Sequence, residues 1–387
     1  MKQFVNYQKF DMARGAAAVL VLVAHIFQIF WYRFLGVENF LSDLSGTFAR
    51  HAVLIFFLLS GYLITLSIIG NIQKNSTFIK SEYISSRLAR IYPPLIGAIL
   101  ITILAWGIIY LFDLPGKSSY RLPTDIYVAR EKFTVSISDI LSALSMSGGL
   151  LYSNGPLWSL YIEFHIYVLA MFAAIIITSK LLWQRIVFSA VLVLLFIYWV
   201  TRDHFFALFT SVWMIGSLAA IISRRSIRIR VIKFARILTI LIFIFTISLL
   251  FLSPHTLSVS NPNTEVNWEV QIALSFFYAY IIFFTTSLDK ILINSLMKAS
   301  DFSYSLYIVH FPLLLLALSV TQNWIGDSLN KTAVVSIFLF ITIIIFANWF
   351  SKLFEQQSVF KPVIQRFLLS AINFFHKVTL ILSSKKV

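Results

Sequence analysis

The stretch DMARGAAAVLVLVAHIF, residues 11–27, decides the fold. Between Arg14 and His25 every residue is Gly, Ala, Val or Leu, which is typical of a membrane span, yet the stretch also carries an acid, a base and a histidine. The whole composition favours a membrane protein, because 59% of the 387 residues are hydrophobic, only 12% are charged, and the mean hydropathy is +0.86. A transmembrane helix needs about 20 mainly apolar residues, and long runs of this kind recur along the chain.

Ten apolar stretches are long enough to span a membrane, so we expect an all-α polytopic membrane protein. They lie at 12–32, 51–70, 91–112, 157–178, 185–201, 204–222, 237–252, 269–287, 302–320 and 332–351. Lys and Arg gather in alternate loops, and the positive-inside rule then places both the N-terminus and the C-terminus in the cytoplasm. A last apolar stretch, 363–383, is expected to lie at the interface, with an eleventh span as the alternative. We therefore predict a transmembrane domain over 1–356 and a cytoplasmic or interfacial amphipathic tail over 357–387.

Several classes of function are disfavoured by the composition. The net charge of +15 comes largely from cytoplasmic loop ends, so it does not indicate nucleic-acid binding. The chain has no cysteine, which excludes thiol catalysis, disulfides and cysteine-ligated metals. No His or carboxylate cluster has metal-ligand spacing, and no glycine-rich phosphate loop is present. A removable signal peptide is not expected, because Trp31 follows the first apolar run where a small-residue cleavage site would stand.

Polar side chains form a stripe on the first span. His25 follows Arg14 by eleven residues, which brings it back to within about 20° on a helix and places it roughly 16 Å deeper. Asp11 lies about 60° to the side of the same stripe. Polar groups inside a span are costly and usually mark a site. Simpler interpretations are a snorkelling Arg14, a histidine hydrogen-bonded between helices, and an Asp11 that caps the helix and pairs with Arg14.

Two other spans carry polar groups near mid-depth. Ser60 lies near the middle of the second span, and Gly61 beside it permits close helix packing. Glu163 lies about 7–8 Å deeper than Trp158 in the fourth span, where a carboxylate needs a partner or a proton.

Two further segments add a histidine and a pair of arginines. His310 lies about 12 Å inside the ninth span and is followed two residues later by Pro312, a residue that kinks helices. Arg87 and Arg90 share one face at the cytoplasmic entry of the third span. They suit phosphate binding, or they reflect the positive-inside bias alone.

Taken together, these motifs resemble the membrane acyltransferase 3 family, the integral membrane O-acyltransferases of bacterial surface polysaccharides (O-antigen acetylase type). The matching residues, in chain order, are Asp11, Arg14, His25, Phe56, Phe57, Ser60, Gly61, Tyr62, Arg87, Arg90, Trp158, Ser159, Leu160, Glu163, Ser303, Tyr304, Ser305, Leu306, Tyr307, His310 and Glu355. The chain departs from the family pattern at Phe164, where a second Glu is frequent, and at Gln357, where a Pro is frequent.

The resemblance implies transfer of an acyl group, usually acetyl, from cytoplasmic acyl-CoA to a hydroxyl of a cell-surface or lipid-linked saccharide, O-antigen or exopolysaccharide, at the bacterial inner membrane. Arg14, Arg87 and Arg90 would hold the phosphates of acetyl-CoA. The catalytic group would be His25, as general base or as acyl carrier, with Asp11 and with Glu163, which would position the acceptor or orient His25. Substrate binding or carbonyl polarisation would fall to Ser60, Tyr62, Trp158, Ser305 and His310. The expected partners are acyl-CoA, the saccharide and membrane lipid, with no metal, no nucleic acid and an open oligomeric state.

The alternative is a secondary transporter or exporter of a lipid-linked saccharide. It accounts equally well for ten spans with polar groups at mid-depth. It also predicts internal repeats and interrupted spans, which the sequence does not show, and it gives the arginine pair no purpose. A purely structural scaffold would leave the buried Glu163 and the histidines without a role.

Overall fold

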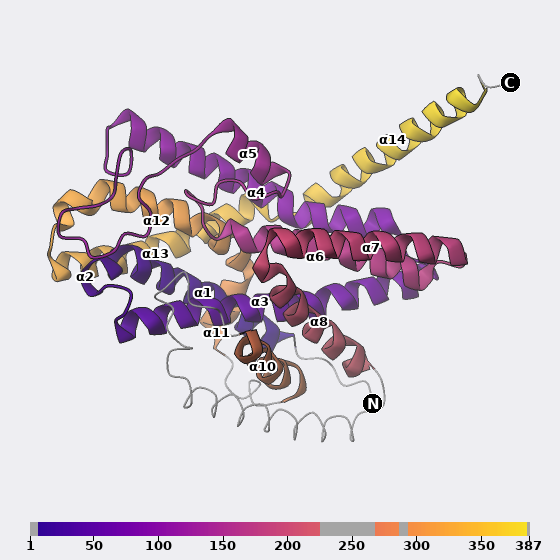
Figure 1. The fold of residues 1–387 in the computed structure, drawn as a ribbon, viewed down its shortest axis with the longest axis horizontal. Helices are drawn as coiled ribbons and strands as arrows, with labels where there is room; N and C mark the ends of the chain where they lie inside the picture. Colours follow the sequence, from indigo (N-terminus) through magenta and orange to yellow (C-terminus); the bar gives the residue numbers. More distant parts are fainter. Residues whose placement is uncertain (1–6, 225–267, 286–292, 385–387) are drawn as a thin grey trace.

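The computed structural model describes residues 7–224, 268–285 and 293–384, and the regular structure in these ranges is entirely helical (Figure 1). The elements are α1 (Gln8–Phe30), α2 (Tyr32–Leu35), α3 (Phe40–Asn75), α4 (Lys80–Leu111), α5 (Ile137–Leu144), α6 (Leu157–Thr178), α7 (Leu182–Arg202), α8 (His204–Arg224), α10 (Trp268–Ala279), the π-helical η2 (Tyr280–Phe284), α11 (Asn294–Ala299), the 3-10 turn η4 (Ser300–Phe302), α12 (Ser303–Ile325), α13 (Leu329–Phe354) and α14 (Gln357–Ser384). The predicted all-α fold class is confirmed.

Eight of the described helices are long and apolar enough to cross a membrane. They correspond to eight of the predicted stretches. Lipid offers no hydrogen-bond partners to the backbone, so an apolar segment that crosses the membrane folds as a helix, which satisfies its own N–H and C=O groups. The stretch at 237–252 lies outside the described residues, and the one at 269–287 forms the shorter α10 followed by η2. The count of ten spans and the cytoplasmic location of both termini therefore stay predictions.

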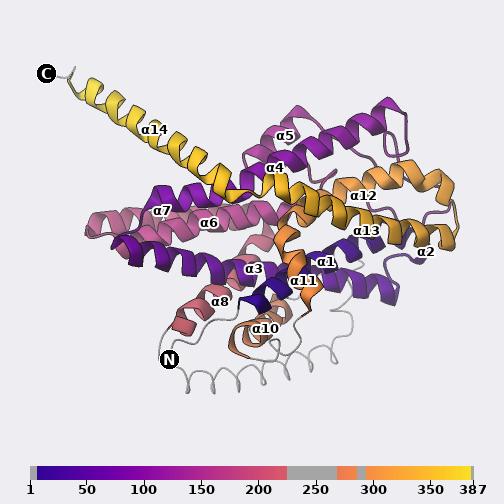
Figure 2. The same cartoon turned by 180° about the vertical axis from the view of Figure 1, so that it is seen from behind.

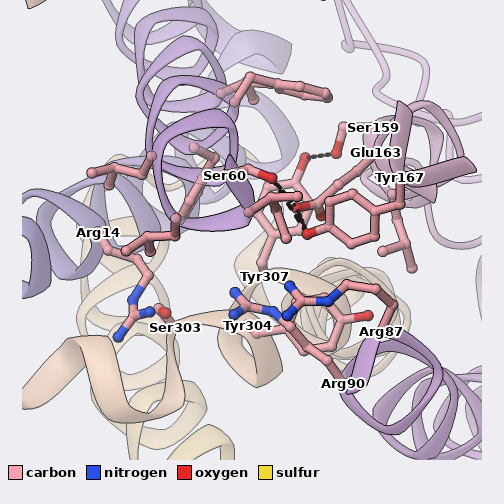
Figure 3. Close-up of a pocket in the computed structure, with 17 residues that line it drawn as sticks. Arg14, Ser60, Arg87, Arg90, Ser159, Glu163, Tyr167, Ser303, Tyr304 and Tyr307 are labelled. Carbon is pink, nitrogen blue, oxygen red and sulfur yellow. Dashed lines mark hydrogen bonds between the residues drawn. The ribbon is translucent and has the colours of Figure 1, made fainter. Parts of the chain in front are cut away.

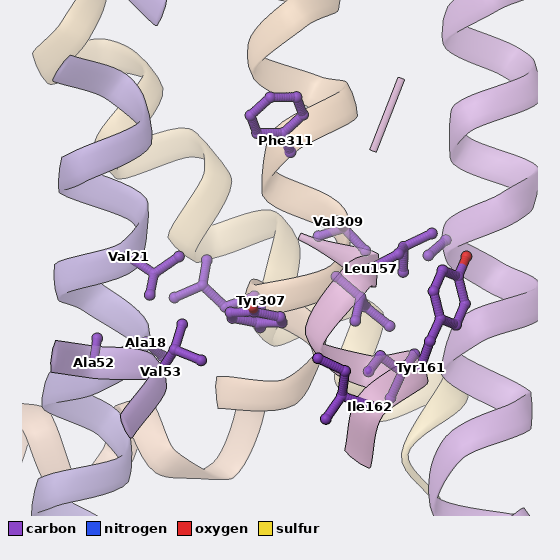
Figure 4. Packing of buried hydrophobic residues seen from close by; sticks show 14 of the residues in the cluster. Ala18, Val21, Ala52, Val53, Leu157, Tyr161, Ile162, Tyr307, Val309 and Phe311 are labelled. Atoms are coloured by element: carbon purple, nitrogen blue, oxygen red, sulfur yellow. The ribbon is translucent and has the colours of Figure 1, made fainter. Parts of the chain in front are cut away.

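The helix α12 forms the centre of the bundle, and the helix α7 its periphery. In the apolar span Asn294–Ile325, which runs from α11 through α12, 67% of the most apolar stretch is buried, whereas none of the corresponding stretch of α7 is. Figure 4 shows side chains of α1, α3, α6 and α12 meeting around Tyr307, with Val53 and Val21 on one side and Leu157 on the other. The sequence places small residues here, such as Ala18 and Ala52, so the helices come close together.

The helices α3 and α8 pack backbone to backbone through a reciprocal pair of glycines. A Cβ atom on Gly61 would lie 2.0 Å from the carbonyl oxygen of Trp213, and one on Gly216 would lie 2.1 Å from that of Leu58. Only glycine allows this approach from both sides, as the sequence predicted for Gly61. The contact fixes the turn of α3 that carries Ser60.

The segment between α4 and α5 folds over the end of α12 that carries Gln322. Tyr120 donates a hydrogen bond to the carbonyl of Leu315 (3.3 Å) and accepts one from Ser319 Oγ (3.1 Å). Arg33 Nε and Asp125 Oδ1 lie 2.9 Å apart in an ion pair whose side chains are only 4% and 3% exposed. These contacts tie the segment to two separate parts of the bundle.

The last helix, α14, leaves the bundle and points away from it in both views (Figures 1 and 2). The first turns of α14 contact α4, where Lys361 lies beside Tyr83 and Ser86. The helix α14 is not among the described helices that qualify as membrane spans. An interfacial or cytoplasmic tail over 357–387 stays a prediction.

Candidate active site

Three cavities follow one another through the bundle, and we name them the mouth, central and outer cavities. The mouth cavity (about 660 Å³) and the central cavity (about 780 Å³) share Arg14, Arg90, Ser303 and Tyr304. The central cavity and the outer cavity (about 1700 Å³) share Val53 and Tyr307. In the predicted orientation the mouth cavity faces the cytoplasm, so a path runs inward to a boundary formed by these last two side chains.

The three predicted arginines all line the central cavity (Figure 3). Arg14 donates hydrogen bonds to Asp11 Oδ1 (3.1 Å) and Ser300 Oγ (3.3 Å). Arg87 donates to Ser67 Oγ (3.3 Å). Within the described part of the chain, no carboxylate oxygen lies within 4.0 Å of a guanidinium nitrogen of Arg87 or Arg90. Two guanidinium groups that face a cavity and are not ion-paired can accept an anionic ligand.

Asp11 contacts Arg14 but does not line any of the three cavities. It pairs with Arg14 from the first turn of α1. The N-cap of α1 is Tyr7, so Asp11 is not the cap that the sequence allowed. The predicted ion pair is confirmed, and the geometry gives this carboxylate an orienting contact only.

Glu163 joins the α3 and α6 helices across the central cavity. Its Oε1 accepts hydrogen bonds from Ser60 Oγ (2.9 Å) and from the hydroxyl of Tyr167, one turn further along α6 (Figure 3). The structure thus brings Ser60 and Glu163 together, as mid-depth groups that share a site. Glu163 lies on the same side of the boundary as the arginines, and it is bonded to Ser60 and Tyr167 rather than to His25.

His25 faces the outer cavity and is paired with His310. Its Nδ1 lies 2.7 Å from His310 Nε2, and the rings stack with centroids 4.9 Å apart. His310 is fully buried, and its Nδ1 lies 2.8 Å from the carbonyl oxygen of Leu306. Both ring nitrogens of His310 are therefore engaged within the protein. It has no N–H left to polarise a substrate carbonyl, which was the role expected from the sequence.

Tyr62 and Ser305 belong to the supporting structure. Tyr62 packs its ring on Phe283 (centroids 4.4 Å apart) and lines none of the three cavities, contrary to the substrate role expected for it. Ser305 is fully buried near the start of α12, and it donates from both its backbone N–H (2.9 Å) and its hydroxyl (2.5 Å) to Glu355 Oε1.

Glu355 supplies a helix cap from a distant part of the chain. The N-cap residue of α12 is Phe302, which has no side chain able to accept a hydrogen bond. Glu355, directly after α13, satisfies one of the free N–H groups at the start of α12. Burial raises the pKa of this carboxyl, while the bonds from Ser305 and the nearby Arg90 and Arg14 act in the opposite direction. It also lines the mouth cavity beside the arginines.

The outer cavity adds residues that the sequence did not single out. Trp158, which was predicted, lines it together with aromatic and polar side chains: Tyr32, Tyr127, Gln28, Arg50 and Gln271. Tyr307, on the boundary, donates or accepts a hydrogen bond with Ser159 Oγ at 2.7 Å. The residues of the outer cavity come from several helices and from the segment between α4 and α5, and they share no local pattern. Tyr167 lines the central cavity instead, and it could have been found from its position four residues after Glu163, on the same helix face.

Comparison with known proteins identifies the family. The family model described as an acyltransferase domain matches residues 7–352. The chain belongs to the acyltransferase 3 family. An O-acetyl transferase of Shigella phage Sf6 is 32% identical over 165 residues, which cover 41% of this chain and 44% of that protein. The match thus spans less than half the length of that relative. No solved structure matches the chain. With eight long apolar helices, this member of the acyltransferase 3 family is a multi-pass membrane protein.

Proposed function

We propose that this protein is a membrane-bound O-acyltransferase of the bacterial inner membrane. It would transfer acetyl from cytoplasmic acetyl-CoA to a hydroxyl of a cell-surface or lipid-linked saccharide, such as O-antigen or exopolysaccharide. Membership of the acyltransferase 3 family and the likeness to a phage O-acetyl transferase support acyl transfer. The observation that carries the proposal is the position of the boundary, because the arginines lie on one side of Val53 and Tyr307 and His25 on the other.

The donor side fits a phosphorylated thioester. Arg14 and Arg90 lie where the mouth and central cavities meet, and Arg87 lines the central cavity. Guanidinium groups bind phosphate through charge-assisted, often bidentate hydrogen bonds. Beyond them the central cavity is lined by apolar side chains such as Phe56, Phe57 and Leu63, which suit the arm that carries the thioester. The acyl group would then reach the boundary next to His25.

The acceptor side fits a sugar. Trp158 and Tyr127 offer flat aromatic faces to the outer cavity, and Gln28, Gln271 and Arg50 offer hydrogen-bonding groups. Apolar walls with a few polar groups that fix orientation are typical of small-ligand sites. A saccharide chain held here would place one hydroxyl near His25.

The chemistry needs one base at the boundary. As the acceptor oxygen forms its bond to the acyl carbon, its proton passes to a ring nitrogen of His25, which acts as general base. The carbon–sulfur bond then breaks, and the sulfur leaves as a thiolate that takes the proton back from His25. The products are the sugar ester and free coenzyme A.

The test is His25→Ala, expressed to the same membrane level as the wild type. Mass spectrometry of surface glycans should show loss of the acetyl mass increment. His165→Gln is the matched control, since His165 stacks on Trp199 between α6 and α7 and lines none of the three cavities. Wild-type acetylation in His25→Ala would remove the proposal. Purified protein that consumes no acetyl-CoA with acceptor present would favour the transporter.

A further inference from the structure

We infer that His310 is a positioning residue that fixes the tautomer and the orientation of His25. The effect of His310 on catalysis rests on the proposed function, whereas the hydrogen bond that fixes the tautomer of His25 rests on geometry alone. The two rings come from α1 and α12, 285 residues apart in sequence, and meet at an Nδ1-to-Nε2 distance of 2.7 Å. A distance this short requires one N–H between the two nitrogens.

The direction of that hydrogen bond follows from the second nitrogen of His310. A backbone carbonyl only accepts, so the Nδ1 of His310, 2.8 Å from the oxygen of Leu306, carries the proton and donates it. In the neutral ring Nε2 is then an acceptor. His25 must therefore donate through its own Nδ1–H, and its Nε2 keeps the lone pair. The Nε2 atom is the one left to receive a proton from a hydroxyl in the outer cavity.

The turn of α12 that carries His310 is held in place from outside the helix. Pro312 has no N–H, so the carbonyl of Ile308, four residues earlier, lacks its helical partner. Buried Asn154 donates its side-chain N–H to that oxygen at 2.8 Å. On the preceding residue, the Tyr307 hydroxyl is hydrogen-bonded to Ser159 Oγ at 2.7 Å. These contacts anchor His310, and Phe311 packs edge-on against the His25 ring (centroids 5.2 Å apart).

The arrangement performs the task that a buried carboxylate performs in other histidine-based sites, with a neutral ring in its place. During transfer the His25 imidazolium keeps its Nδ1–H on His310 Nε2, and only Nε2 exchanges a proton with the substrate. Wrong-tautomer variants of such sites lose up to about 10⁴-fold in rate, so the effect should be large. A carboxylate partner would stabilise the charged imidazolium of His25. Neutral His310 adds no such charge, so His25 returns readily to the neutral form that acts as a base.

The structural part is tested on the wild type by ¹⁵N NMR of histidine-labelled protein in lipid bilayers. We expect His25 to carry its proton on Nδ1, and a through-hydrogen-bond ¹⁵N–¹⁵N coupling to connect it to His310 Nε2. The signal is assigned by its loss in His25→Gln. A His25 proton on Nε2, or no coupling, would overturn the inference whether or not the protein is an acetyltransferase.

The functional part compares two substitutions at His310. His310→Gln keeps an acceptor for the His25 N–H and should retain kcat within about tenfold, whereas His310→Phe fills the space without an acceptor and should lose about 100-fold or more. The KM for acetyl-CoA should stay constant, because the arginines are untouched. Equal kcat in His310→Phe and wild type, at equal thermal stability, would refute the positioning role. A wild type without any acetyl transfer would instead refute the proposed function.

Discussion

At the scale of single residues, Arg87 in the central cavity is held by weak, replaceable partners. Arg87 donates to a serine hydroxyl and lies over the rings of Tyr83 and Tyr167. Its guanidinium is therefore oriented without being neutralised. A phosphate group can take over these contacts with a gain in charge-assisted hydrogen bonding, which a tight internal ion pair would prevent.

Removing an arginine of the central cavity should weaken donor binding. A hydrogen bond to a charged group contributes about 1.5–3 kcal/mol, so Arg90→Ala should bind acetyl-CoA about 10- to 100-fold more weakly. Equilibrium binding to the detergent-solubilised protein measures this. Arg121→Ala is the control, because Arg121 pairs with Glu131 on the surface, away from the cavities, and its affinity should not change. Wild-type affinity in Arg90→Ala would contradict the donor site.

Single residues also show where sequence reasoning works. The stripe of Arg14 and His25 follows from helical spacing, and both side chains line cavities as that spacing requires. The motif predicts a substrate role for Tyr62 because it follows Ser60 closely in the sequence. Two residues along a helix turn the side chain by about 200°, so it lies against Phe283 on the other face. The pairing of His25 with His310 depends on tertiary packing, which spacing within one span does not contain.

At the scale of elements, the approach of α3 to α8 sets the position of the Ser60 hydroxyl. The two glycines interlock, with each facing a backbone carbonyl of the other helix. The length of their apolar stretches predicts both helices. It does not predict that they pack against each other, because many spans carry small residues.

A methyl group at this contact should separate the helices. In Gly61→Ala the new Cβ would meet the Trp213 carbonyl at 2.0 Å, and overpacking of this kind costs about 1–3 kcal/mol or more. We expect a lower thermal midpoint in detergent and a loss of activity through Ser60. Gly70→Ala on the same helix is the control, since nothing lies within 4 Å of its Cβ position. The same melting behaviour in both variants would show that the contact does not hold the helices.

At the scale of the whole molecule, the segment after α4 joins the bundle at the end that carries α2. Arg33 and Asp125 form a buried ion pair there, and the backbone N–H of Ile126 donates to the carbonyl of Arg33 at 3.0 Å. Hydropathy predicted the bundle itself, but a polar loop gives no periodic signal that could predict this attachment.

Breaking the buried pair should destabilise the whole fold. Asp125→Ala leaves the buried Arg33 charge without its carboxylate, with only the carbonyl of Gly326 to accept from it, and breaking a buried pair in this way costs about 3–5 kcal/mol. A clear fall in thermal midpoint is expected, whereas Glu131→Ala, which breaks the exposed pair with Arg121, should melt like the wild type. If both variants melt alike, the Arg33–Asp125 pair does not hold the segment.

The boundary of Val53 and Tyr307 has an electrical consequence. Moving one elementary charge through 100 mV is worth about 2.3 kcal/mol, and coenzyme A carries several negative charges. With donor and acceptor kept on opposite sides, the acyl group crosses the boundary in one direction and the hydroxyl proton replaces it from the other, so no net charge is moved. Turnover in proteoliposomes should then be the same under potassium diffusion potentials of either polarity. A rate that follows the voltage would mean that a charged partner moves across the bilayer as well.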